Sequence, residues 1–121
     1  MLVQTNTYYV PPDKRDHHQR LMRHFRQTLH RLGCDRFAVY EQTDADFAPS
    51  STPGRFVQVM RFRDRRHHQT VQEAERRDPT ARDLIRQFCE LIDFPSQQAQ
   101  GLFAVNYYTL LPDSSSEPPQ G

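Results

Sequence analysis

The sequence predicts an α+β domain whose strands and helices follow the order β-α-β-β-α-β. Two internal echoes support this prediction. The segment NTYYV at residues 6–10 returns near the other end as NYYTL at 106–110, and DHHQ at 16–19 is answered fifty residues later by RHHQ at 66–69. Each histidine pair follows a strand-like segment and lies in a helix-like one, so each half of the chain is a strand that leads into a helix.

The first strand and helix account for the N-terminal part of the chain. Residues 2–10, LVQTNTYYV, are rich in β-branched and aromatic side chains, which favour a strand, and two prolines follow. Asp13 is a suitable N-cap for a helix over 14–32. Within that range the apolar residues recur at helical spacing, and Gly33 supplies the stop.

The second and third strands form a hairpin with a long connection. Residues 36–43, RFAVYEQT, and 55–62, RFVQVMRF, both have the composition of strands. Between them, residues 44–54, DADFAPSSTPG, carry the Asp, Ser, Pro and Gly content that is typical of a loop.

The second helical region is interrupted by a proline. Asp64 can cap a helix that runs to about residue 78, and Pro79 then begins a second helix that reaches about residue 93. Residues 101–111, GLFAVNYYTLL, are the fourth strand. The composition of 112–121, PDSSSEPPQG, predicts a disordered tail, so the folded domain spans 1–111.

This order is that of a ferredoxin-like domain, a four-stranded antiparallel sheet with both helices on one face. The echo pairs Val10 with Met60 and His17 with His67. The face without helices is expected to carry Val3, Tyr9, Val57, Val59, Phe103 and Val105. A large apolar face requires a partner, and packing two such sheets together makes a two-fold homodimer, the dimeric α+β barrel.

Composition excludes several classes of protein. Sixteen basic and fifteen acidic residues leave a net charge of +1, so no global field attracts nucleic acid. No apolar run is long enough to span a membrane, and the N-terminus lacks a signal pattern, so we expect a cytoplasmic protein. Cys34 and Cys89 match no metal or redox motif, which favours two free thiols.

The middle of the chain resembles a known family. Residues 33–64, GCDRFAVYEQTDADFAPSSTPGRFVQVMRFRD, and residues 75–92, ERRDPTARDLIRQFCELI, resemble the antibiotic biosynthesis monooxygenase family of dimeric α+β barrels. The resemblance covers roughly residues 2–110. That family includes cofactor-independent oxygenases acting on phenols and quinols, haem-degrading enzymes, and members with no known activity. Its pockets tend to lie between the sheet and the helices.

The resemblance also bears on cofactors. Haem-degrading members use an Asn on the first strand, a Trp at the end of the third strand and a His on the following helix. Asn6 matches the first, but Phe62 stands at the Trp position, and Val71 or Gln72 at the His position. We therefore expect no haem and no other cofactor.

Strand periodicity and the echo predict which side chains line a pocket. Successive strand residues face opposite sides of a sheet, so alternate residues of the first and third strands share one face. Two residues of the fourth strand could join them. The predicted substrate-binding residues are Asn6, Tyr8, Gln58, Met60, Phe62, Asn106 and Tyr108. Their amides, phenols and apolar groups suit a small hydrophobic or aromatic ligand. The alternative is a core in which the polar groups only satisfy the backbone.

Histidines are the candidate bases, since they titrate near neutrality. His18 aligns with the apolar face of the first helix, and His67 and His68 begin the second. Adjacent histidines on a helix point about 100° apart, so neither pair binds a metal easily and no metal site is expected.

The candidate residues predict a small-molecule-binding dimeric α+β barrel, and the resemblance implies that it is a cofactor-independent monooxygenase of an aromatic or quinol-type substrate. One alternative is a non-catalytic ligand-binding or stress-related dimer of the same fold, and another is a purely structural interaction domain. An RNA-binding module has the same topology, but PGRFVQVMRF lacks the aromatic spacing that such modules need.

Overall fold

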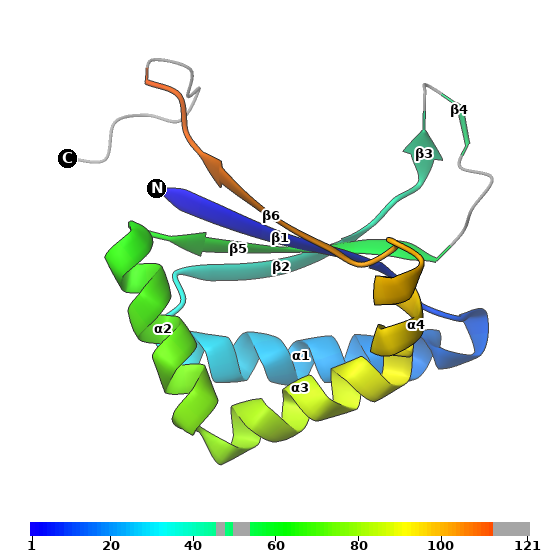
Figure 1. The fold of residues 1–121 in the computed structure, drawn as a ribbon, viewed down its shortest axis with the longest axis horizontal. Coiled ribbons are helices and arrows are strands. Elements are labelled where there is room, and N and C mark those ends of the chain that lie inside the picture. The colour runs from blue at the N-terminus through cyan, green and yellow to red at the C-terminus, as the bar shows by residue number, and fades with distance from the viewer. Residues whose placement is uncertain (46–47, 50–53, 113–121) are drawn as a thin grey trace.

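The ferredoxin-like fold is confirmed. A computed structural model describes residues 1–45, 48–49 and 54–112. Its main sheet is antiparallel, with the strand order β2-β5-β1-β6, and the helices lie together on one face of it (Figure 1). The four strands are β1 (Leu2–Tyr9), β2 (Arg36–Glu41), β5 (Arg55–Phe62) and β6 (Ala104–Thr109).

The first helix begins differently from the prediction. A short 3-10 helix, η1 (Pro12–Lys14), precedes α1 (Arg15–Arg31), so Asp13 lies inside η1 and makes no side-chain cap. The two prolines set backbone angles that suit this tight turn. The C-terminal end agrees with the prediction, because Gly33 has φ = 102° and terminates the helix.

The prolyl break in the second helical region is confirmed. Helix α2 (Arg65–Arg77) begins after Asp64, whose carboxylate accepts a hydrogen bond from the His67 N–H at 2.8 Å. Helix α3 (Pro79–Ile92) begins after Asp78, which accepts from the Ala81 N–H at 2.9 Å. Each carboxylate satisfies a backbone donor that the helix itself leaves unpaired.

A further helix follows where the sequence predicted only an end. Pro95 lies in the first turn of α4 (Phe94–Ala99), a position that tolerates proline because its missing N–H would be unpaired there. Gln97 of this helix accepts from the Tyr9 N–H at 2.9 Å and donates to the Tyr9 carbonyl at 2.8 Å. This side chain therefore fastens α4 to the end of β1.

Part of the predicted loop is ordered into a small ladder. Strands β3 (Asp44–Ala45) and β4 (Ala48–Pro49) pair antiparallel within the segment 44–54. Residues 46–47 and 50–53 lie outside the described residues. So do residues 113–121, which hold nearly all of the tail that composition predicts to be disordered.

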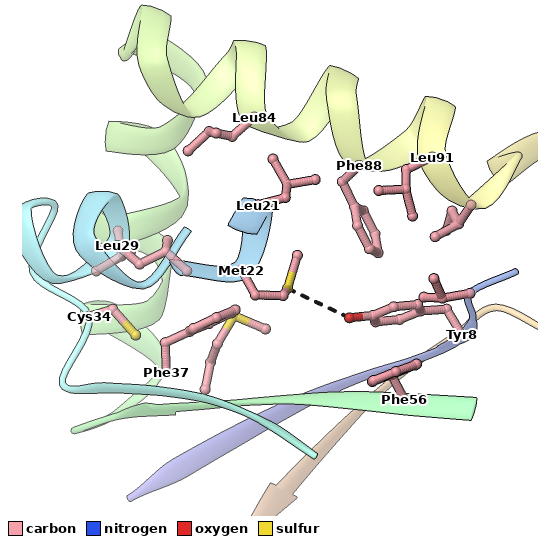
Figure 2. Packing of buried hydrophobic residues seen from close by; sticks show 14 of the residues in the cluster. Tyr8, Leu21, Met22, Leu29, Cys34, Phe37, Phe56, Leu84, Phe88 and Leu91 are labelled. Atoms are coloured by element: carbon pink, nitrogen blue, oxygen red, sulfur yellow. Dashed lines mark hydrogen bonds between the residues drawn. The ribbon is translucent and has the colours of Figure 1, made fainter. Parts of the chain in front are cut away.

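The hydrophobic core fills the layer between the sheet and the helices. Figure 2 shows side chains of α1 and α3 pointing toward those of β1, β2 and β5. Tyr8 is central, with an exposed fraction of 0%, and its ring meets the edge of Phe88 at 4.7 Å between centroids. The labelled core residues are Tyr8, Leu21, Met22, Leu29, Cys34, Phe37, Phe56, Leu84, Phe88 and Leu91.

The register decides which side chains face the helices. Even-numbered residues of β1 and β5 lie directly opposite one another, as in Tyr8 with Phe56, and these point into the core. Strand β6 pairs Leu2 with Thr109, so its odd-numbered residues share that side. Phe103 and Val105 were predicted on the helix-free face, and the structure corrects this: Phe103 packs against Phe94 in the core layer.

Among the residues that the structure describes, none of the helices has the length and apolar character needed to cross a membrane.

Candidate functional site

Six polar side chains form one continuous row of hydrogen bonds on the helix-facing side of the sheet. In order they are His68, Gln4, Asn6, Gln58, Tyr8 and His18. Successive donor–acceptor distances are 2.9, 3.0, 2.9, 3.3 and 2.7 Å. We call these six residues the polar row. It brings together five of the residues that the sequence singled out, and adds Gln4.

The local structure explains how the polar row forms. Gln4, Asn6 and Tyr8 alternate along β1, so all three point to the helices. Gln58 lies directly opposite Asn6 on β5, which places the two amides within hydrogen-bond reach. The histidines come from the first turns of α1 and α2, and close the row at its two ends.

The direction of the hydrogen bonds is determined by chemistry. An amide oxygen can only accept, so His68 Nε2 donates to Gln4 Oε1, and each amide then donates to the next. Gln58 donates to the Tyr8 oxygen, which leaves the phenol hydrogen for His18 Nε2 at 2.7 Å in preference to Met22 Sδ at 3.7 Å.

Both terminal histidines are neutral at physiological pH. Burial, together with the nearby positive charge of Arg15, lowers the pKa of His18 to about 4, against a smaller opposing effect of Glu41. Burial likewise lowers the pKa of His68, with smaller contributions from Arg65 and His67. A neutral His18 can accept from Tyr8, which is the arrangement that the polar row requires. Burial also raises the pKa of the Tyr8 phenol, so this group stays protonated and acts as a donor.

An inner cavity of about 200 Å³ lies over the middle of the polar row. Its polar floor is formed by Gln4, Asn6 and Gln58, beside Met60. Its walls are mostly aromatic, with a phenylalanine from each of β2, α1, α3, α4 and the segment before β6. These are Phe37, Phe25, Phe88, Phe94 and Phe103. Apolar walls over a few fixed polar groups are typical of a small-molecule site.

Glu75 is the acidic residue that lines this cavity, and no sequence pattern had indicated it. Burial raises the pKa of its carboxyl to about 7, against a smaller opposing effect of Arg76. Within the described residues, no hydrogen bond or ion pair to the Glu75 side chain is found. A carboxyl that titrates near neutrality beside an apolar cavity has the properties of a general base.

His67 is engaged elsewhere. Its Nδ1 accepts from the Arg63 N–H at 3.0 Å, and its Nε2 donates to the Gly33 carbonyl at 2.7 Å. Both ring nitrogens thus tie the start of α2 to the turn after α1, and neither is left for a substrate. His67 does not line the inner cavity.

His18 faces a second hollow rather than the inner cavity. This hollow has a volume of about 300 Å³ and lies beside the ion pair between Arg15 and Glu41. His18 reaches the inner cavity only through Tyr8 and Gln58. It is therefore placed to orient the polar row rather than to contact a ligand in that cavity.

Four predicted binding residues do not line the inner cavity. One is Tyr8, which is fully buried with its hydroxyl between His18 and Gln58 in the polar row. Asn106 and Tyr108 pair with Thr5 and Val3, so they face the helix-free side, and the prediction for them is corrected. The register of β6 on β1 gives β6 the opposite parity to that of β1 and β5. Phe62 is on the helix side but only 2% exposed, with its ring against His67 and His68, so it is part of the core.

The residues present do not fit haem. Phe62 and Val71 carry no donor atom for iron, and both are buried in the core with exposed fractions of 2% and 1%. Gln72 does line the inner cavity, but an amide is not among the groups that usually ligate haem iron, which are His, Cys, Met and Tyr. Within the described ranges, no group of three or more His, Cys, Asp or Glu side chains is arranged to hold a metal ion. Cys34 and Cys89 are both free thiols.

Comparison with known proteins gives the fold. No protein-family model and no curated protein matches the chain. Solved structures do match. A candidate antibiotic biosynthesis monooxygenase from Nitrosomonas europaea is 16% identical, with a TM-score of 0.65 over 92% of this chain and 99% of that chain. A second structure, described as an antibiotic biosynthesis monooxygenase, is 14% identical, with a TM-score of 0.63 over 93% and 100% of the two chains.

A different kind of neighbour is equally similar. An uncharacterised NIPSNAP domain protein from Burkholderia xenovorans is 14% identical, with a TM-score of 0.67 over 96% of this chain and 100% of that chain. At these identities the likeness shows the fold alone. The resemblance to the monooxygenase family is thereby confirmed at the level of the fold.

Proposed function

We propose that this protein binds a small aromatic molecule in the inner cavity and oxidises it with O2 without a cofactor, as a monooxygenase of a quinol-type substrate. One observation carries the proposal: Glu75, with a pKa near 7, and the amides of Gln4 and Asn6 line the same apolar cavity. Cofactor-free oxygenation needs a base, donors to an oxyanion and an apolar pocket, and these residues supply the three.

The proposed reaction begins with proton removal by Glu75. The Glu75 carboxylate removes the proton of a ring hydroxyl, and the resulting anion passes one electron to O2. The substrate radical and superoxide combine into a peroxide at a ring carbon that bears hydrogen, and loss of water leaves a carbonyl there. A quinol and O2 thus give a hydroxyquinone and water, with one atom of O2 in each product.

The amides are suited to stabilise the substrate anion. In the polar row, Gln4 and Asn6 each donate one N–H to the next residue. A primary amide has two N–H groups, so each retains one donor for a ligand oxygen. Their positions are held from both sides by hydrogen bonds, so little reorganisation is needed when charge develops on the substrate.

The test uses methylhydroquinone as the probe and follows oxygen uptake together with incorporation of 18O from labelled O2. Incorporation of one labelled atom into the quinone is the expected result, since spontaneous oxidation yields peroxide without labelling the ring. Glu75→Gln should reduce the rate about 10²- to 10⁴-fold. The matched control Glu73→Gln, at an exposed position of the same helix, should leave it unchanged.

The pH profile provides a second test. Because the pKa of Glu75 is raised to about 7, its basic form grows as pH rises through 7, and kcat/KM should rise over that interval. Full turnover by Glu75→Gln would refute the role of the carboxyl. If Asn6→Ala also left turnover untouched, the inner cavity would not be the site.

Binding without turnover is the second candidate function. The inner cavity is smaller than the 300–1,000 Å³ of most ligand sites, and a single substituted ring fills it. A non-catalytic ligand-binding protein needs the same cavity but no base. Ligand binding with no labelled product would favour this alternative.

A homodimer through the helix-free face is part of the proposal. The centre of this face is formed by Thr5, Val59 and Ala38, which lie side by side on β1, β5 and β2. Native mass spectrometry should show a dimer, which Val59→Arg should convert to a monomer. Gln69→Arg, on the exposed side of α2, should leave the dimer intact. A monomeric wild-type protein would overturn this part of the proposal.

A further inference from the structure

The inner cavity meets a groove at the surface, which is separate from the hollow beside His18. This groove, of about 510 Å³ between α2 and α3, is lined by Gln72, Glu75 and Ile85, and these three side chains also line the inner cavity. The groove is thus the approach to the cavity from outside. A ligand in the cavity that is larger than one ring would extend past Glu75 into it.

The rest of the groove is lined by cations. Its other lining residues are Arg76 from α2, and Arg82 and Arg86 from α3. Arg82 and Arg86 are four residues apart, and therefore neighbours on one face of the helix, with Ile85 beside them. Three guanidinium groups thus surround the approach to an apolar cavity.

Among the described residues, two of these three guanidinium groups form no ion pair. Arg86 forms ion pairs with Asp83 at 2.6 Å and with Glu90 at 3.0 Å. For the side chains of Arg76 and Arg82, no ion pair or hydrogen bond is found within the part of the chain that the structure describes. The two acidic residues near Arg82 in sequence form ion pairs with other arginines. Asp83 pairs with Arg86, and Asp78 pairs with Arg31 at 2.9 Å.

The position of Arg82 is not explained by helix stability. It lies in the first turn of α3, where the helix dipole disfavours a positive charge. Arg76 lies in the last turn of α2, where the helix dipole favours a cation, so helix stability by itself explains a positive charge at that position. A cation at the unfavourable end, facing a second unpaired cation across a groove, creates a local field that an anion would neutralise.

We infer that the ligand of the inner cavity is an aromatic carboxylate whose ring enters the cavity while its carboxylate binds Arg76 and Arg82 in the groove. This inference rests on the proposed function, because it assumes that the inner cavity binds a ring. A guanidinium binds a carboxylate through two parallel hydrogen bonds, which fixes the orientation of the ligand as well as holding it. A monoanion suits the site, since two cations lie near a carboxyl, Glu75, that is itself partly ionised at neutral pH.

The test compares two probes that differ in charge but hardly in shape, 4-hydroxyphenylacetate and 4-hydroxyphenylacetamide. Binding to the full chain is measured by titration calorimetry and by ligand-observed NMR, neither of which depends on turnover. We expect the carboxylate to bind roughly ten- to a hundredfold more tightly than the amide, as is typical of a charge-assisted hydrogen bond. The preference should shrink as salt is added.

Three variants locate the effect. Arg76→Gln and Arg82→Gln should each weaken carboxylate binding by about tenfold and leave amide binding unchanged. Arg77→Gln is the matched control, because Arg77 is in the same last turn of α2 but does not line the groove, and it should bind like wild type. Circular dichroism of each variant establishes that the fold is retained.

Cys89 reports where the ring binds. Its thiol lines the inner cavity and is half-buried, whereas Cys34 is only 4% exposed. The carboxylate probe should therefore slow the alkylation of Cys89 by iodoacetamide. Mass spectrometry measures the rate of this alkylation. Equal binding of the two probes, with Cys89 protected by both, would overturn the carboxylate inference and leave the cavity standing. Binding of neither probe, with Cys89 unprotected, would overturn the cavity itself and the proposed function with it.

Discussion

Tyr8→Phe tests the polar row more directly than any other substitution, because it deletes one oxygen and keeps the ring. In the folded protein that oxygen donates to His18 Nε2 at 2.7 Å and accepts from Gln58 Nε2 at 3.3 Å. The ring itself, stacked on Phe56 and edge-on to Phe88, has room to stay where it is. The change therefore removes polar contacts with little loss of packing.

The magnitude follows from what is left unpaired. His18 is 3% exposed, so its Nε2 is left buried without its hydrogen-bond partner once the hydroxyl is removed. Gln58 is 4% exposed but keeps a contact with Met22 Sδ at 3.4 Å. One buried acceptor without a partner and one weakened donor should together cost about 2–3 kcal/mol of unfolding free energy.

Urea and thermal unfolding measure this cost. For a domain of this size the expected loss lowers Tm by about 6–15 °C. Tyr107→Phe is the control, because Tyr107 is 47% exposed and its ring contact with His68 does not involve the hydroxyl. If Tyr8→Phe unfolded within about 0.5 kcal/mol of this control, the polar row would contribute nothing to stability. The account of a fixed hydrogen-bond direction would then be wrong.

Three further substitutions test other parts of the structure. The pKa of His18 is lowered to about 4 in the folded state, so the unfolded state binds more protons as the pH falls. The free energy of unfolding should therefore decrease on the order of 3 kcal/mol from pH 6.5 to 4. In His18→Gln this part of the pH dependence should be missing from the urea midpoints. Asp78→Ala, which removes the α3 cap, should cost about 1–2 kcal/mol by thermal melting, and no change would refute the cap. Gly54→Ala should destabilise the protein more than Gly101→Ala, because a Cβ at position 54 would lie 2.7 Å from the Val10 carbonyl oxygen, whereas a Cβ at position 101 would meet no atom. Equal melting temperatures of the two variants would contradict this.

The alternation of β1 and β5 could be predicted because it depends on local chemistry. Asn6 and Tyr8 are two residues apart, so any strand places them on one face. The echo extended that face correctly to Gln58 and Met60, since antiparallel strands paired with an even register keep the same parity. Three of the cavity residues were accessible in this way from the sequence.

The parity of β6 could not be predicted, because it depends on a register between segments a hundred residues apart. NYYTL resembles NTYYV, and that likeness suggested that Asn106 and Tyr108 share the pocket face. The observed pairing of Leu2 with Thr109 gives the opposite parity. A shift of one residue moves every side chain of a strand to the other face, so local composition carries no information on the outcome.

The sequence by itself determined the order of the four main strands and of the helices α1 to α3, the prolyl break between α2 and α3, and the alternation that aligns the amides. Periodicity, capping and turn chemistry act over a few residues, so they can be recognised along the chain. Only the tertiary structure selected Glu75 from a charged stretch of α2, because its raised pKa is caused by burial. Only the tertiary structure joined His18 to His68 through four intervening side chains, because burial and strand pairing are properties of the assembled layers.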